Sequence, residues 1–172
     1  MSATPGEELL RWQARQIAPT LPAPCALLRP LRPLRVDLEK KVTANHDRIR
    51  RTTTDVVRIG GARTNARWTR KFMAHDPRED LRRITVPVLA ITGAKDLQVR
   101  PDLDAIASCV RGTAETRLVP DLTHTLRRRP GPPSLGAYEE ELRRPLDADL
   151  VATVVEWCSG ATHPTRPRGT NT

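Results

Sequence analysis

The stretch VPVLAITGAKDLQV, residues 86–99, decides the fold class of this chain. Its apolar run from Val86 to Ile91 contains β-branched residues and stops where Gly93 permits a turn, which is the pattern of a buried strand. One acidic residue, Asp96, follows the strand in this turn. An aspartate in such a place caps a turn or helix, binds a ligand or orients a catalytic histidine.

The segments after this strand predict a parallel β-α-β unit. PDLDAIASCVRG (101–112) places its apolar residues on one helical face and is expected to end at Gly112. AETRLVPDLTH (114–124) is a second short strand, and DADLVATVVEWCSG (147–160) is a final helix. A strand, a helix, a strand and a helix in this order indicate an α/β fold with two parallel strands and covering helices over residues 76–160.

The first part of the chain predicts helices and no strand. TPGEELLRWQARQI begins with a capping Thr4 and a proline in the first turn, and a long polar helix is expected from Val36 to Arg50. A further helical segment breaks at Gly60-Gly61 and resumes through Phe72. Between the first two helices, PLRPLR (30–35) matches a P-x-x-P-x-R peptide, but the spacing arises easily in a chain rich in Pro and Arg, and a crossing between helices is the preferred interpretation. Residues 161–172 read as a disordered tail.

Composition and charge restrict the class of protein. The chain has 172 residues, 38% of them hydrophobic, which is enough for one domain with a core. Lys and Arg number 29 against 20 Asp and Glu, and the net charge is +9. Because the arginines occur in every segment and alternate with acids, with Arg127–Arg129 as the densest cluster, the sequence argues against a nucleic-acid partner.

The cysteines and the hydropathy indicate a cytoplasmic protein. Cys25, Cys109 and Cys158 are odd in number and widely spaced, which favours reduced thiols and argues against a disulfide framework, a zinc site or another cofactor. Cys158 follows an apolar helical stripe and is expected to be buried. No stretch is apolar enough for a membrane span, and the N-terminus has acids where a signal peptide would be apolar.

Both predicted strands deliver a polar side chain just beyond their carboxyl ends, namely Asp96 and His124. A right-handed crossover brings the ends of parallel strands to the same edge of a sheet, so the two residues are expected to meet there. An aspartate that binds one ring nitrogen fixes the tautomer of the histidine and leaves the other nitrogen free to act as general base. Alone, each residue has an ordinary structural explanation, a turn acid and a loop histidine.

The other histidines are assigned no catalytic role: His75 is expected to be structural, and His46 and His163 to be exposed.

ITVPVLAITGAKDLQV followed by LVPDLTHTL resembles the C-terminal part of α/β-hydrolases, in the branch of bacterial serine aminopeptidases, dienelactone hydrolases and acyl esterases. The resemblance implies that Asp96 is the triad acid and His124 the triad base, and that the substrate is a small-molecule ester, thioester or amide. It also implies that residues 1–75 form a helical cap or lid, residues 76–160 the hydrolase core segment, and Trp68 part of the substrate pocket.

The chain departs from this family at the nucleophile. Such enzymes carry a serine in G-x-S-x-G after a strand. None of Ser2, Ser108, Ser134 and Ser159 lies in that motif. The sequence therefore predicts an N-terminally truncated hydrolase that is weak or inactive alone and self-associates through an exposed sheet edge. The alternatives are a non-catalytic basic binding module and the product of a misassigned start.

Overall fold

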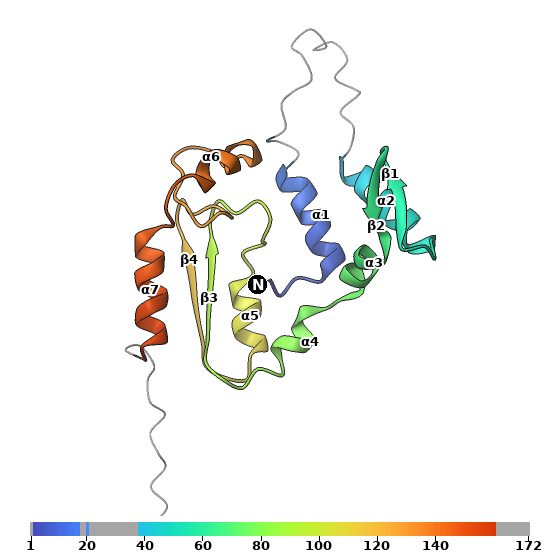
Figure 1. The fold of residues 1–172 in the computed structure, drawn as a ribbon. Helices are drawn as coiled ribbons and strands as arrows, with labels where there is room; N and C mark the ends of the chain where they lie inside the picture. The colour runs from blue at the N-terminus through green and yellow to red at the C-terminus, as the bar shows by residue number, and fades with distance from the viewer. Residues whose placement is uncertain (1, 18–19, 21–37, 161–172) are drawn as a thin grey trace, which may run out of the picture.

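The computed structural model describes residues 2–17, 20 and 38–160. The predictions for Cys25, the proline-rich peptide 30–35, His163 and the tail 161–172 lie outside these residues. Helices and strands follow the chain in the order α1 (Gly6–Ile17), α2 (Leu38–Arg51), β1 (Val56–Ile59), β2 (Ala62–Asn65), α3 (Ala66–Ala74), α4 (Pro77–Leu81), β3 (Val88–Gly93), α5 (Leu103–Cys109), β4 (Ala114–Val119), the 3-10 helix η3 (Leu135–Ala137), α6 (Tyr138–Leu142) and α7 (Ala148–Cys158) (Figure 1).

Strands β3 and β4 form a parallel pair, as the sequence predicts. Their register runs from Val88 opposite Ala114 to Gly93 opposite Val119, so both strands end at the same level. Helix α5 connects them across one face, and α7 lies on the other face (Figure 1). This part of the chain is therefore α/β, with two parallel strands and a helix on each side.

The core of this α/β part lies under α5. Leu81 at the end of α4 is 1% exposed and Ile106 on α5 is 2% exposed. They pack with Ala3, Leu103 and Val110, and Val88 and Ala90 of β3 contact this cluster. Burying these aliphatic side chains holds α5 against the sheet and thereby fixes the crossover between the two strands.

The expectation that residues 5–75 contain no strand is wrong. Val56–Ile59 and Ala62–Asn65 form an antiparallel hairpin between α2 and α3. Gly60 and Gly61 have φ angles of +55° and +85°, the pair of positive values that a tight two-residue hairpin turn needs. The Gly-Gly pair therefore turns a hairpin where the sequence analysis placed a break between helices. Val57 and Ile59 pack against Ile49, Ala66 and Met73, which form the core of this part of the chain.

Three smaller expectations are also corrected. Gly112 does not act as the C-terminal stop of α5; a Cβ there would lie 2.2 Å from the carbonyl oxygen of Val86, so the position needs glycine because two backbone segments meet. His46, expected to be exposed, is 6% exposed between α1 and α2, and this burial lowers its pKa. Cys158, expected to be buried, is exposed at the last position of α7.

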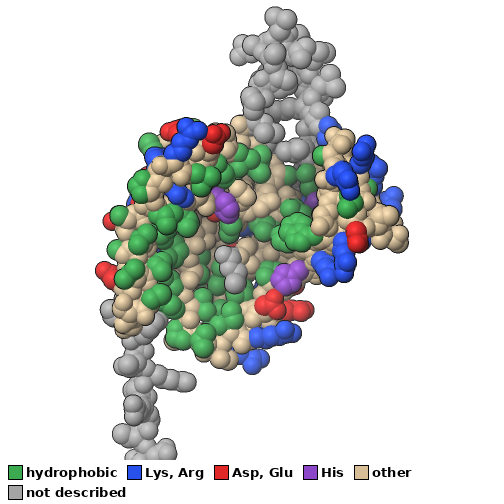
Figure 2. Space-filling model, in the orientation of Figure 1, with side chains coloured by type: hydrophobic (Ala, Val, Ile, Leu, Met, Phe, Trp, Pro, Cys, Tyr) green, Lys and Arg blue, Asp and Glu red, His purple; other side chains and the backbone are tan. Residues whose placement is uncertain are grey.

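An apolar surface extends over α7 and the adjoining loops (Figure 2). Leu118 is 53% exposed, and on α7 Val151, Val154 and Val155 are 40–58% exposed. Within the described residues β3 pairs only with β4, so the other edge of β3 carries no strand. Self-association through this edge stays a prediction. Among the helices of the described part, none combines the length and apolar composition required to cross a membrane.

Replacing Leu81 tests whether the cluster under α5 holds the α/β part together. Leu81→Ala removes a 1% exposed side chain and should lower the free energy of unfolding by about 2–5 kcal/mol. Leu142→Ala removes the same atoms from a side chain that is 61% exposed and should change it by less than about 0.5 kcal/mol. Urea denaturation followed by circular dichroism measures both, and equal losses would contradict the assignment of the core.

Candidate acid–base site

Asp96 uses its two carboxylate oxygens for two different tasks. Oδ1 accepts hydrogen bonds from the backbone N–H groups of Gln98 (2.7 Å) and Val99 (2.9 Å), which closes the turn after β3. Oδ2 faces the other way and accepts a hydrogen bond from His124 Nδ1 at 3.0 Å. The side chain of Asp96 is only 8% exposed. One oxygen of Asp96 therefore closes the turn, and the other contacts the His124 ring.

His124 presents its second ring nitrogen to solvent. The side chain is 40% exposed, and among the described residues Nε2 has no hydrogen-bond partner. The Tyr138 ring stacks beside the imidazole, with 6.3 Å between ring centroids and 19° between ring planes. Burial raises the pKa of the Tyr138 hydroxyl, so this ring stays neutral beside the imidazole. An imidazole held at Nδ1 by a carboxylate and open at Nε2 can accept or donate a proton at Nε2.

Glu141 of α6 holds the loop that carries His124 through hydrogen bonds. Thr123 Oγ1 and Thr125 Oγ1 donate hydrogen bonds to the same oxygen, Glu141 Oε2, at 2.8 and 2.7 Å. Glu141 is 0% exposed, and both threonines are buried. His124 lies between these two threonines in a turn that is closed by a hydrogen bond from the Leu126 N–H to the Thr123 carbonyl oxygen. The threonines fix this turn to Glu141, while the half-exposed His124 side chain reaches Asp96.

Close backbone contact between the two strand ends completes the arrangement. Gly93 lies against Leu122, and a Cβ at Gly93 would be 2.1 Å from the Leu122 carbonyl oxygen. The same oxygen accepts a hydrogen bond from the N–H of Lys95 at 3.0 Å. Lys95 also reaches across with its side chain, donating to the Arg129 carbonyl oxygen at 2.6 Å and pairing with Asp121 at 2.5 Å. Lys95 thus connects the turn after β3 to the loop after β4.

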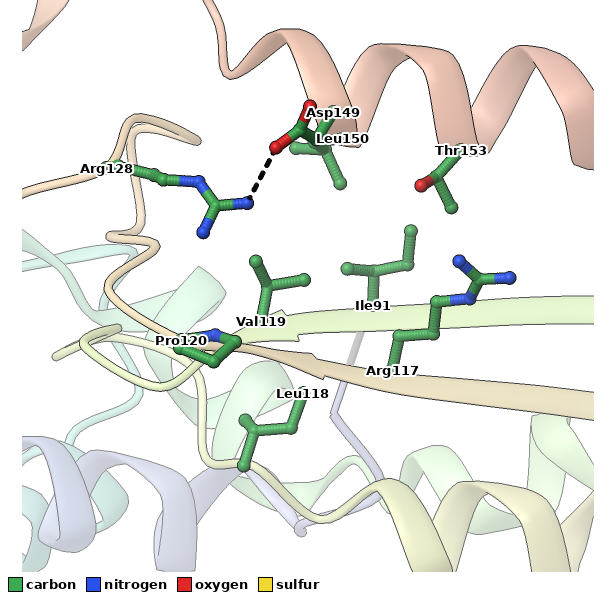
Figure 3. A pocket seen from close by; sticks show the side chains of 9 residues that line it. All are labelled: Ile91, Arg117, Leu118, Val119, Pro120, Arg128, Asp149, Leu150 and Thr153. Atoms are coloured by element: carbon green, nitrogen blue, oxygen red, sulfur yellow. Dashed lines mark hydrogen bonds and ion pairs between the residues drawn. The ribbon is translucent and has the colours of Figure 1, made fainter.

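The two described cavities lie apart from this pair of residues. One, of about 320 Å³, lies between α7 and the sheet, where Ile91 and Val119 face Leu150 and Thr153, and Arg128 pairs with Asp149 at its rim (Figure 3). The other, of about 280 Å³, lies between α1 and α2 and includes His46. Neither is lined by Asp96, His124 or Trp68. The described residues also contain no group of three metal-ligating side chains.

The remaining predicted site residues do not join the pair. Trp68 is 57% exposed on α3 and stacks on Phe72, with ring centroids 5.0 Å apart. Its role in a substrate pocket stays a prediction. Ser2 donates to Asp102, and Ser159 donates to the Val155 carbonyl oxygen at the end of α7. In the described part of the chain, no serine hydroxyl forms a hydrogen bond with His124.

Comparison with models of known protein families, with curated proteins and with solved structures found no match to this chain.

Gly93→Ala should separate the two loops. The added Cβ would overlap backbone atoms of Leu122, which have no flexible end that can move aside, so the free energy of unfolding should fall by about 1–3 kcal/mol. The NMR signals of the His124 ring should shift as well, because Leu122 and His124 belong to the same loop. Gly136→Ala is the matched control, since its nearest contact would be 3.6 Å away. Wild-type stability and unchanged His124 signals in Gly93→Ala would contradict the close contact.

Glu141→Ala should remove the acceptor that two buried hydroxyl groups share, which leaves them with the 2.9 Å contact between them and the 3.2 Å contact of Thr123 Oγ1 with the Arg127 carbonyl oxygen. The free energy of unfolding should fall by about 1–3 kcal/mol. Glu141→Gln keeps an oxygen for the threonines and should cost less. Hydrogen exchange of the Leu126 amide, which donates to the Thr123 carbonyl oxygen, measures the local effect and should accelerate more in the alanine variant. Equal exchange rates in the wild type and both variants would show that Glu141 does not hold the loop.

Proposed function

We propose that this chain provides the acid and base of an α/β-hydrolase site that transfers acyl groups. The 3.0 Å contact between His124 Nδ1 and Asp96 Oδ2, at adjacent ends of parallel strands, is the observation that carries the proposal. The order of the two residues along the chain and the free Nε2 support it. The substrate class is a small-molecule ester, thioester or amide, as the resemblance implies.

In this proposal His124 moves two protons. Its Nε2 removes the proton from a serine hydroxyl as the serine oxygen attacks the acyl carbonyl, and the resulting imidazolium is stabilised by Asp96. The imidazolium then gives the proton to the departing alcohol, thiol or amine as the bond to the acyl carbon breaks. In the second half, His124 takes a proton from water as the water oxygen attacks the acyl-serine. The imidazolium then gives this proton to the serine oxygen as its bond to the acyl carbon breaks, which releases the acid and restores the hydroxyl.

The proposal places the serine nucleophile outside residues 1–172, because no serine of this sequence lies in G-x-S-x-G. The isolated chain should then hydrolyse p-nitrophenyl esters no faster than His124→Ala. Removal of the nucleophile of a serine hydrolase lowers turnover about a millionfold. Turnover that requires His124 in the isolated chain would contradict this part of the proposal.

A fluorophosphonate probe, which reacts with serines activated by a neighbouring base, tests the proposal in the cell. Tagged wild-type chain is made in its own host, treated with the probe and recovered under native conditions, and labelled peptides are identified by mass spectrometry. We expect a labelled serine in material recovered with the wild type and its loss with His124→Ala and Asp96→Asn. His75→Ala is the matched control, because His75 also contacts an aspartate, Asp80, at 3.4 Å.

Absence of labelling in every sample, or labelling that persists in His124→Ala, would overturn the proposal. Asp96 and His124 would then be a structural pair that closes the junction between two loops.

A further inference from the structure

The positive charge of this protein is concentrated in one part of the fold. Residues 38–74, which form α2, the hairpin β1–β2 and α3, contain ten Lys and Arg and three Asp and Glu, a net charge of +7. Residues 75–172 contain 14 of each kind and are neutral. We call residues 38–74 the basic unit. In Figure 2 its basic side chains gather beside the hairpin, whereas the surface over α7 is mostly apolar.

The hairpin places two of these charges directly opposite each other. Arg58 of β1 pairs in register with Arg63 of β2, and both are exposed. Val57 and Ile59 pack inward on the core of the basic unit, so Arg58 between them points to solvent. Among the described residues no acidic side chain pairs with either arginine. Like charges opposite each other on a hairpin are destabilising, and a bound anion would relieve their repulsion.

An exposed aromatic ring lies on the helix that follows the hairpin. Trp68 is 57% exposed and stacks on Phe72 at an interplanar angle of 11°, which holds the indole in one orientation. Arg67, beside it in sequence, is exposed as well. A basic surface that tracks phosphates together with an aromatic ring that stacks on bases is the combination by which proteins bind single-stranded nucleic acids.

We propose that the basic unit binds single-stranded nucleic acid, with Arg58 and Arg63 on the phosphates and Trp68 stacked on a base. Seven of its ten basic residues are arginine, whose planar guanidinium binds a phosphate through two hydrogen bonds. An anionic membrane fits less well, because membrane-surface helices need a broad apolar face. The apolar side chains Ile49 and Met73 of this unit are buried. The inference is independent of the acyl-transfer site and reverses the expectation drawn from dispersed charges along the sequence.

Fluorescence anisotropy of a labelled oligothymidylate of about 20 nucleotides, titrated with the full chain, tests the inference. The logarithm of the association constant should fall linearly with the logarithm of the salt concentration between about 50 and about 200 mM. Arg58→Gln/Arg63→Gln should make that slope shallower by about 1.4, since two phosphate contacts on a single strand are lost. Trp68→Ala should weaken binding by about 5- to 100-fold and leave the slope unchanged, because stacking involves no counterions.

Arg82→Gln/Arg83→Gln is the matched control, because it removes two exposed charges from the loop after α4, outside the basic unit. This variant and His124→Ala should bind as the wild type does. Circular dichroism establishes that each variant is folded. Absence of binding at low salt would overturn the inference, and so would equal weakening by the two arginine pairs. Binding to phosphatidylserine vesicles without binding to the oligonucleotide would overturn it in favour of a membrane surface.

Discussion

The parallel pairing of β3 with β4 is the constraint on which the rest of the structure depends. Because the two strands end in register, at Gly93 and Val119, the segments that follow them start side by side. Backbone hydrogen bonds continue beyond the strands, from Ala94 to Val119 and from Lys95 to Leu122. The turn that holds Asp96 and the loop that holds His124 are therefore joined before their side chains meet, and the burial of α5 on the sheet supplies the free energy that keeps the pairing.

Sequence patterns predicted this half of the molecule because its signals are local. The apolar run before Gly93 and the rule that parallel strands end at one edge were enough to bring Asp96 and His124 together. Glu141 was missed, since nothing in the run YEEEL shows which of its acids is buried, and no local pattern links it to the threonines on either side of His124. The hairpin was missed although Gly60-Gly61 after the β-branched run Val56–Ile59 is a hairpin signal, because the arginines and threonines around it also fit a polar helix.

Helix α1 links the two parts of the fold. Gln13 donates a hydrogen bond to the carbonyl oxygen of Gln98, in the turn that Asp96 closes, at 2.6 Å. On the same helix Glu7 pairs with Arg50 of α2. Burial alone would raise the pKa of Glu7, but the hydrogen bond and the positive charge of Arg50 lower it below the ordinary value. One helix thus contacts both the acid–base site and the basic unit. The neutral α/β part and the basic unit differ in charge, but both contact α1, through Gln13 and Glu7 respectively.

The tautomer of His124 tests the central claim, that Asp96 orients this imidazole and leaves Nε2 free, most directly. Long-range ¹H–¹⁵N correlation spectra of the full chain, recorded at a pH where the imidazole is neutral, report which ring nitrogen carries the proton. The account predicts a single tautomer with the proton on Nδ1, and a mixture of tautomers in Asp96→Ala. A proton on Nε2 in the wild type, or a mixture that Asp96→Ala leaves unchanged, would contradict it, because Asp96 would then not hold the base.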